Sequence, residues 1–183
     1  MNHFVKGNPD LCMGCRTCMI ACVVSHEGSH IFEIDPDSYS FNPRLHMVKT
    51  ATISVPVQCK HCEDPACKAV CPNDCISIID NVVTINTTNC IGCKNCMNAC
   101  PFGAIDMTEV KCEYQAKGEK KIVANKCDLC RENPDGPACV AVCPTEALKV
   151  VSEEDLINNV EKNRQNTAKE LNEASLKAEK VCK

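Results

Sequence analysis

Four groups of cysteines are the residues of this sequence whose type and spacing could do chemistry. The chain has 183 residues, and 19 of them are cysteine. Sixteen fall into four groups that share the ending x3-Cys, and this recurrence is an internal repeat. In chain order the groups are Cys12, Cys15, Cys18 and Cys22; Cys59, Cys62, Cys67 and Cys71; Cys90, Cys93, Cys96 and Cys100; and Cys127, Cys130, Cys139 and Cys143.

The spacing indicates metal clusters rather than single ions. The run from Cys90 to Pro101 reads Cys-x2-Cys-x2-Cys-x3-Cys-Pro, which is the signature of cubane [4Fe–4S] sites. Three cysteines in a tight loop can bind the same cubane cluster. The fourth cysteine lies beyond a turn and can bind the neighbouring cluster. Proline follows the fourth cysteine in three groups and redirects the backbone there, but Val23 takes its place in the first group. We therefore expect four [4Fe–4S] clusters as cofactors.

Two other interpretations of the cysteines are weaker. Structural zinc also takes four cysteines, but zinc sites normally present two separated Cys-x2-Cys knuckles and lack the x3-Cys-Pro ending. A disulfide framework fits poorly because the number of cysteines is odd and the first eleven residues show neither an apolar stretch nor a twin arginine. Patterned cysteines of this kind are typical of a reducing compartment, so we expect the protein in the cytoplasm.

The ligands of each cluster depend on which groups pair. The second and third groups are close in sequence, so we expect them to form one two-cluster unit, with the first and fourth groups paired around it. The predicted ligand sets are Cys12, Cys15, Cys18 and Cys143 for cluster 1; Cys59, Cys62, Cys67 and Cys100 for cluster 2; Cys90, Cys93, Cys96 and Cys71 for cluster 3; and Cys127, Cys130, Cys139 and Cys22 for cluster 4. The alternative pairs the first group with the second and the third with the fourth.

Short strands and turns must position these loops, because 3% aromatic residues and no tryptophan are too few for an ordinary core. A β-hairpin is predicted for residues 76–85 around Asp80-Asn81, and a second for residues 109–125 around Lys117-Gly118. Single strands are predicted for residues 45–55, 104–107 and 147–151.

The tail, residues 152–183, begins with a capping box at Ser152 and Asp155 and contains no glycine or proline. This pattern predicts one helix of about 30 residues, roughly 45 Å long.

Several stretches resemble a known family, the four-cluster iron–sulfur subunits of molybdenum or tungsten oxidoreductases and hydrogenases. The resemblance covers about residues 3 to 151. Its most specific stretches are Cys12 to Cys22 with His26, Asn42 to Leu45, Pro56 to Cys67, and Lys126 to Cys130. It implies the same nested pairing of clusters and a role in electron transfer for formate dehydrogenases, formate hydrogenlyase-type complexes or hydrogen-dependent CO2 reductases. The helical tail and the lack of a membrane anchor depart from the family pattern.

The predicted fold is α+β, with two ferredoxin-like 2[4Fe–4S] units, the second nested in the first, short β-hairpins and a long C-terminal helix. We expect a polyferredoxin domain at residues 1–151 and a helical arm at residues 152–183. Within the domain, the inner unit covers about residues 56–108, and the outer unit comprises residues 1–30 together with 109–151.

The sequence does not decide the roles of five residues that lie beside or outside the four cysteine groups. Cys75, Cys112 and Cys182 are left over, and single cysteines are commonly small buried hydrophobes. His26 and His61 lie next to predicted ligands, where a histidine can hydrogen-bond a cluster sulfur and tune its reduction potential. A packing or surface role for the two histidines is the equal alternative.

Charge and missing motifs exclude several function classes. The net charge of −4 and the lack of a basic stripe argue against nucleic acid as a binding partner. The sequence contains no run of 18 apolar residues, the length needed to span a bilayer. No catalytic triad, P-loop or dinucleotide motif is present, so we expect no catalytic role.

If every predicted cluster ligand is a cysteine, no iron of the clusters has a free coordination position for a substrate. We therefore expect an electron-transfer subunit that relays single electrons between catalytic subunits of an oxidoreductase complex. The favoured partners are a molybdenum or tungsten formate dehydrogenase, or CO2 reductase, and a hydrogenase. Another iron–sulfur subunit or further copies could bind through the helix of residues 152–183. The alternatives are a free, diffusible polyferredoxin and a scaffold subunit whose C-terminal helix drives oligomer assembly.

Overall fold

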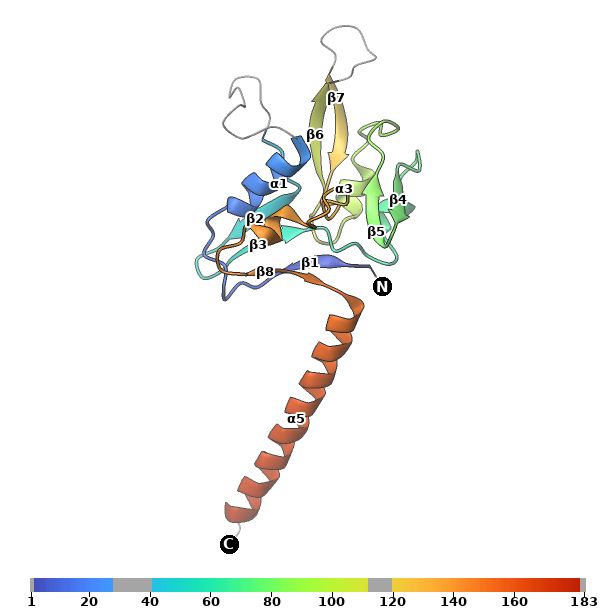
Figure 1. The fold of residues 1–183 in the computed structure, drawn as a ribbon. Coiled ribbons are helices and arrows are strands. Elements are labelled where there is room, and N and C mark those ends of the chain that lie inside the picture. The colour runs from blue at the N-terminus through green and yellow to red at the C-terminus, as the bar shows by residue number, and fades with distance from the viewer. Residues whose placement is uncertain (1, 28–40, 112–119, 182–183) are drawn as a thin grey trace. The chain divides into compact units, whose positions relative to one another are not determined.

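The computed structural model describes residues 2–27, 41–111 and 120–181 (Figure 1). Its described part is an α+β fold of eight short strands and five helices. The strands are β1 (Phe4–Gly7), β2 (Leu45–Lys49), β3 (Ser54–Gln58), β4 (Ile76–Ile79), β5 (Val82–Ile85), β6 (Asp106–Lys111), β7 (Lys120–Asn125) and β8 (Leu148–Val151). The helices are α1 (Thr17–Glu27), α2 (Ala66–Ala69), α3 (Asn95–Ala99), α4 (Ala138–Ala141) and α5 (Glu153–Val181). Contacts divide the chain into two compact units, Met1–Val150 and Val151–Lys183.

The strands of the described residues pair in twos, as β1–β8, β2–β3, β4–β5 and β6–β7. The hairpin β4–β5 is confirmed where the sequence predicts it, with Ile79 opposite Val82. Its two turn residues both lie in the left-handed region, with φ of 50° at Asp80 and 63° at Asn81. Asp and Asn tolerate this conformation better than most residues, so they form the two-residue turn that matches the twist of the strands.

Two strand predictions were wrong in extent. Residues 45–55 form no single strand, because β2 and β3 fold back on each other about a turn at Thr50. Thr50 donates its N–H to the Ile53 carbonyl at 2.8 Å and accepts the Ile53 N–H on its hydroxyl at 3.1 Å. The hydroxyl makes this turn without the glycine or proline that would have marked it in the sequence.

The strand predicted for residues 104–107 and the hairpin predicted for residues 109–125 are one element. The strand β6 begins at Asp106 and pairs with β7 out to Lys111 and Lys120. Ala104 and Ile105 precede the strand and are buried. The predicted turn at Lys117-Gly118 lies outside the described residues.

The strand β1 was not predicted, and it joins the beginning of the first unit to its end. It pairs with β8, the strand predicted for residues 147–151. Next to the pair, the Asn8 N–H donates to the Ala147 carbonyl at 2.7 Å. Val5 is fully buried at the centre of β1. This pairing brings the loop of the first cysteine group close to the last cysteine of the fourth group.

Helices α1 to α4 repeat one local design, because each contains or adjoins the third cysteine of its group. Helices α2, α3 and α4 end before the fourth cysteine, since a residue that precedes proline disfavours the helical conformation. The first group has Val23 in place of proline, and α1 accordingly continues through Cys22 to Glu27.

The buried side chains form two groups, and nearly half of the buried residues in each group are cysteines. One combines Val5, Leu45 and Leu148 with cysteines of the first, second and fourth groups. The other combines Val83 and Val123 with cysteines of the second and third groups. Apolar side chains alone therefore make a thin core, as the composition predicts.

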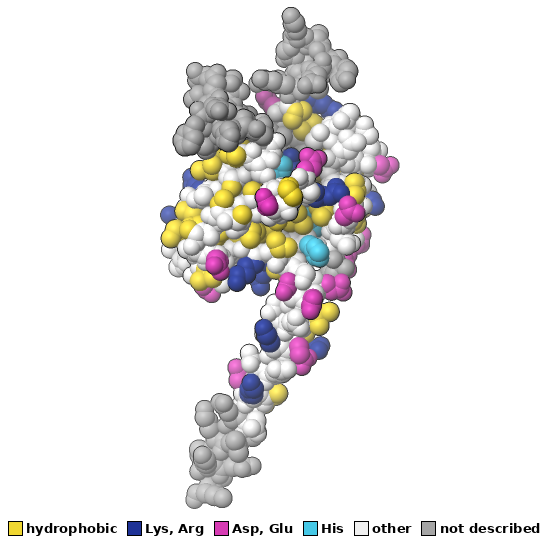
Figure 2. All heavy atoms as spheres, viewed as in Figure 1, with side chains coloured by type: hydrophobic (Ala, Val, Ile, Leu, Met, Phe, Trp, Pro, Cys, Tyr) yellow, Lys and Arg dark blue, Asp and Glu magenta, His cyan; other side chains and the backbone are white. Residues whose placement is uncertain are grey.

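The tail forms the long helix α5, which confirms the prediction. At its start, the Ser152 hydroxyl accepts the Asp155 N–H at 3.2 Å, and the Asp155 carboxylate accepts the Ser152 N–H at 2.9 Å. This reciprocal capping box satisfies donors that would otherwise lack a partner at a helix N-terminus. Charged side chains of both signs follow one another along the helix (Figure 2). No helix in the described part of the chain is long and apolar enough to cross a membrane.

Candidate metal centres

The four cysteine loops share one feature of the backbone conformation. In each group the residue before the second cysteine has a positive φ. These residues are Gly14, His61, Gly92 and Leu129, with φ of 72°, 47°, 68° and 60°. A left-handed residue at this point curls the chain tightly between two cysteines. Glycine adopts it without strain in two groups, whereas His61 and Leu129 adopt it at a cost in conformational energy.

Two of the predicted ligand sets each surround a small cavity. Cys12, Cys15, Cys18 and Cys143 line the first cavity, together with Met47 and Pro56 of the hairpin β2–β3. The predicted ligands of cluster 3 line the second cavity, and these are Cys71, Cys90, Cys93 and Cys96. Each cavity thus combines three predicted ligands from one loop with one predicted ligand from another.

The other two sets are also brought together. Cys59 and Cys100 are close enough to Cys62 and to Cys67 for their charges to act on both thiols. In the same way, Cys139 lies near Cys22, Cys127 and Cys130.

Burial shapes the acidity of the third cysteine of each group. It raises the pKa of Cys18 and Cys67 to about 11, and it raises that of Cys96 and Cys139 as well. A thiolate is the form that binds metal. Because the protein itself disfavours charge at these sulfurs, a bound cation or cluster is what would compensate buried thiolates here. The cavities and the donor set therefore fit an iron–sulfur cluster.

Backbone N–H groups donate to the sulfurs at repeated positions. The fourth cysteine accepts from the residue four positions on in two groups, Cys75 to Cys71 at 3.3 Å and Ala104 to Cys100 at 3.4 Å. In the first group Arg44, on another segment, donates to Cys22 at 3.3 Å. N–H bonds of this kind stabilise negative charge on sulfur and set the reduction potential of a cluster.

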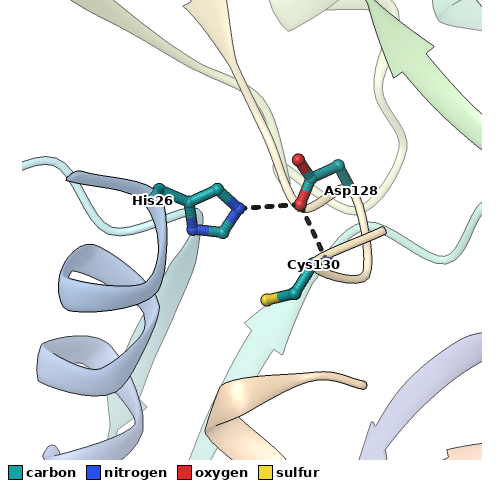
Figure 3. A group of neighbouring side chains, drawn as sticks. All are labelled: His26, Asp128 and Cys130. Atoms are coloured by element: carbon teal, nitrogen blue, oxygen red, sulfur yellow. Dashed lines mark hydrogen bonds and ion pairs between the residues drawn. The ribbon is translucent and has the colours of Figure 1, made fainter. Parts of the chain in front are cut away.

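His26 belongs to a polar network rather than to a simple packing contact. Its Nε2 lies 2.9 Å from the Asp128 carboxylate (Figure 3). Its Nδ1 donates to the Cys22 carbonyl at 2.6 Å. Arg44 also pairs with Asp128, and the Cys130 N–H donates to the same carboxylate at 3.0 Å. Burial opposes protonation of His26, but the hydrogen bonds to Asp128 and Cys22 outweigh it and raise the pKa to about 10. His26 is therefore a cation that ties α1 to the fourth cysteine loop.

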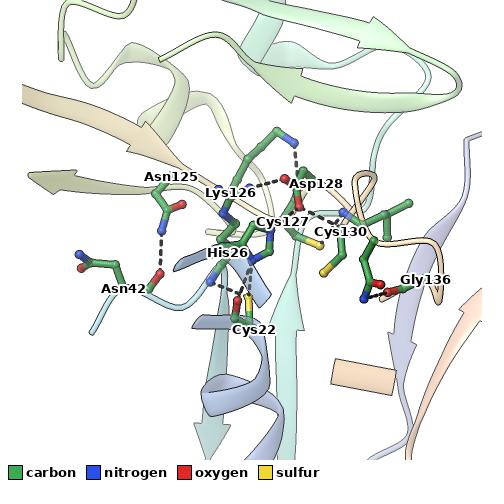
Figure 4. A network of polar contacts seen from close by, with 12 residues as sticks. Cys22, His26, Asn42, Asn125, Lys126, Cys127, Asp128, Cys130 and Gly136 are labelled. Carbon is green, nitrogen blue, oxygen red and sulfur yellow. Dashed lines mark hydrogen bonds and ion pairs between the residues drawn. The ribbon is translucent and has the colours of Figure 1, made fainter. Parts of the chain in front are cut away.

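His61 is almost fully buried in the second loop, with 1% of its surface exposed. The ring Nδ1 accepts the Val83 N–H at 3.1 Å. The backbone N–H of His61 donates to Cys59 Sγ at 3.4 Å. Burial first, and then the charge of Lys126, lower the pKa of His61 to about 3. Lys126 is itself buried and donates to the carbonyl of Cys127 (Figure 4). It also donates to the carbonyl of Val83.

Sequence reasoning assigned no role to Arg44, Lys126 or Asp128. All three stand in stretches that carry the family resemblance, and that is the only signal the sequence offered. Their partners lie far away along the chain, so spacing could not have revealed the contacts.

Of the left-over cysteines, Cys75 is buried and lines the same cavity as the predicted ligands of cluster 3. It is therefore the small buried residue that the sequence suggests, although it lies beside a predicted metal centre. Cys112 and Cys182 lie outside the described residues.

Comparisons with known proteins agree with this chemistry. Residues 50–153 match a family described as a 4Fe-4S dicluster domain, and residues 9–24 match a 4Fe-4S binding domain. Electron transport protein HydN of Escherichia coli K12 is 42% identical over 175 residues, which cover 92% of this chain and 98% of that protein. Hydrogenase-4 component A of the same strain is 37% identical over 183 residues and 85% of each chain. The putative electron transport protein YsaA is 42% identical over 155 residues, 84% of this chain and 92% of that protein.

Proposed function

The chain belongs to the 4Fe-4S dicluster family of iron–sulfur electron-transport proteins, and we propose that it relays single electrons through four clusters between catalytic subunits of an oxidoreductase complex. Its cofactors are [4Fe–4S] clusters. Each bound cluster supplies a one-electron carrier that is closed to substrate when all its ligands are cysteine. The observation that carries the proposal is the convergence of cysteines from distant loops on common sites.

The proposed ligand sets are those of the nested pairing. Support comes from the two cavities, where Cys143 joins the first loop and Cys71 joins the third. In the alternative pairing, Cys71 would join the first loop because the second group would pair with the first. Cys71 instead lines a cavity with the cysteines of the third loop. We accordingly propose a polyferredoxin domain at residues 1–151, with an inner unit at about 56–108, and a separate helical arm at residues 152–183.

We propose that the clusters follow one another in the order 1, 4, 2, 3. Cys18 of the first site acts electrostatically on Cys139 of the fourth, and Cys59 of the second site acts on Cys127 of the fourth. Cys100, a proposed ligand of cluster 2, packs against both groups of buried side chains. The two end sites carry the exposed cysteines Cys15 and Cys93, which suits the entry and exit of electrons.

The proposed partners are a hydrogenase at one end and a molybdenum or tungsten formate dehydrogenase, or CO2 reductase, at the other. The hydrogenase is supported by the similarity to hydrogenase-4 component A. The formate enzyme rests on the family resemblance of the cysteine stretches. Cysteines that serve as metal ligands are typical of a reducing compartment, so we propose a cytoplasmic location.

Anaerobic reconstitution tests the number of clusters. We expect about sixteen irons per chain and EPR signals of reduced cubanes that account for about four electrons. The variant Cys143→Ala distinguishes the two pairings of the cysteine groups. In the nested pairing, this variant should abolish the EPR signal of cluster 1 alone. An iron content near eight per chain would contradict the four-cluster relay.

Co-purification separates a permanent subunit from a diffusible carrier. Tagged protein from native cells, run on gel filtration under anaerobic conditions, should elute together with a large catalytic subunit. Elution at the size of the free chain, with full iron content, would instead support the diffusible polyferredoxin.

A second role in assembly is favoured by one feature of α5. Ile157, Val160 and Leu171 recur on this helix and are 62%, 47% and 65% exposed. Deleting residues 152–183 should reduce the size of the assembly and leave the iron content per chain unchanged. An unchanged assembly size would show that the helix does not join subunits, and it would leave the electron relay untouched.

A further inference from the structure

Lys126 is a buried cation without a carboxylate partner among the residues that the structure describes. Only 4% of its surface is exposed. Its ammonium group donates to the carbonyl of Val83 and, at 2.8 Å, to the carbonyl of Cys127. Carbonyl oxygens solvate the ammonium group but do not neutralise it, and a buried charge without a counter-charge is costly. This position therefore calls for negative charge close by.

His61 presents an unsatisfied hydrogen-bond donor in the same place. Because Nδ1 accepts the Val83 N–H, the proton of the neutral ring is on Nε2. Nε2 is buried and has no hydrogen-bond partner among the described residues. A buried donor without a partner is rare in native proteins, so an acceptor that is not a protein atom is expected there.

One residue of β5 holds both groups. Val83 donates its N–H to Nδ1 of His61 and accepts from Lys126 on its carbonyl. The cation stands directly before Cys127 of site 4, and its charge acts on Cys62 and Cys67 of site 2. Lys126 and His61 are thus placed between the two central sites of the proposed row.

We propose that Lys126 and His61 raise the reduction potentials of the two central clusters, with the Nε2–H of His61 donating to a sulfur of the cluster held by Cys59, Cys62, Cys67 and Cys100. The inference rests on the proposed function. A cluster becomes more negative by one charge when it is reduced, and a fixed cation nearby favours the reduced form. An N–H bond to sulfur acts in the same direction.

The test is an EPR-monitored redox titration of the loaded full-length protein. In Lys126→Met, the ratio of reduced to oxidised central cluster at a fixed potential should fall about tenfold, which corresponds to about 59 mV for one electron. Lys126→Arg keeps the charge and should restore most of the ratio. Lys121→Met is the matched control, because the Lys121 ammonium also donates to two carbonyls, those of Thr87 and Thr88, but at an exposed position. It should leave the central clusters unchanged.

The contribution of His61 has a spectroscopic signature. Protein labelled with 15N-histidine should show a hyperfine coupling from one histidine to a reduced central cluster, and His61→Asn should abolish it. Absence of that coupling in the unmodified protein would overturn the assignment of His61.

The outcomes separate this inference from the proposed function. Full iron content with unchanged potentials in Lys126→Met would overturn the inference and leave the four-cluster relay intact. Loss of iron in Lys126→Met would assign the lysine to assembly of the site and would also overturn the inference. Failure of the unmodified protein to bind reducible cubanes would defeat the proposed function itself.

Discussion

At the scale of single residues, the chain separates cysteines that are proposed as ligands from a cysteine that only lies beside them. Cys96 and Cys75 line the same cavity and are both buried. Cys96 stands in the repeated spacing, whereas Cys75 follows the fourth cysteine of its group and donates its N–H to Cys71 Sγ.

This contrast gives the first prediction. Cys96→Ala should lower the iron content by about four per chain, because one cubane loses a ligand. Cys75→Ala should keep the full iron content, since its backbone N–H remains. Iron analysis of the two reconstituted variants is the measurement, and equal losses in both would refute the distinction.

The charged contacts of His26 give a second prediction. Asp128→Asn leaves His26 and Arg44 facing a neutral amide, so we expect the free energy of unfolding of the loaded protein to fall by about 1–3 kcal/mol. Asp128 is 28% exposed, which places the expected loss near the lower end of that range. Thermal melting under anaerobic conditions is the measurement. Asp135→Asn, at an exposed position, serves as the control and should melt like the unmodified protein.

At the scale of the elements, local signals in the sequence predicted some structures well. Asp80-Asn81 predicted the hairpin β4–β5, and Ser152 with Asp155 predicted the start of α5, because each depends on neighbouring residues alone. The turn at Thr50 and the strand β1 were missed, since a hydroxyl group makes the first and a distant partner strand makes the second. Pairing across the chain also hid the roles of Arg44 and Lys126.

The third prediction concerns the third cysteine loop and the hairpin that covers it. An added Cβ at Gly92 would lie 2.7 Å from the backbone oxygen of Ile122 on β7, so Gly92→Ala must displace either the loop or the hairpin. We expect the melting temperature of the loaded protein to fall by several degrees. Gly103→Ala is the matched control, because Gly103 also has a positive φ but a Cβ there would meet nothing within 4 Å. Equal shifts in the two variants would mean that the left-handed conformation, not the contact, determines the loss.

At the scale of the whole molecule, we expect the first unit to depend on its metal sites for stability. Where the structure describes this unit, its strands pair in twos, and isolated two-stranded hairpins are marginally stable in water. Ten of the 24 buried hydrophobic residues in the described part of the chain are cysteines.

The fourth prediction follows from this dependence. Removal of iron with a chelator under reducing conditions should abolish the cooperative thermal transition and most of the protection of residues 2–27, 41–111 and 120–150 against proteolysis. Circular dichroism and limited proteolysis are the measurements. A cooperative melt in the iron-free protein would show that the apolar side chains suffice.

The convergence of Cys143 with Cys12, Cys15 and Cys18 has a consequence for biosynthesis. The first loop leaves the ribosome early, but Cys143, its proposed fourth ligand, is translated much later. All residues of the second and third groups emerge before Cys143. In the cell, the inner pair of sites should therefore be completed first, and three thiols of the first loop must be kept reduced and free of stray metal until synthesis is almost finished.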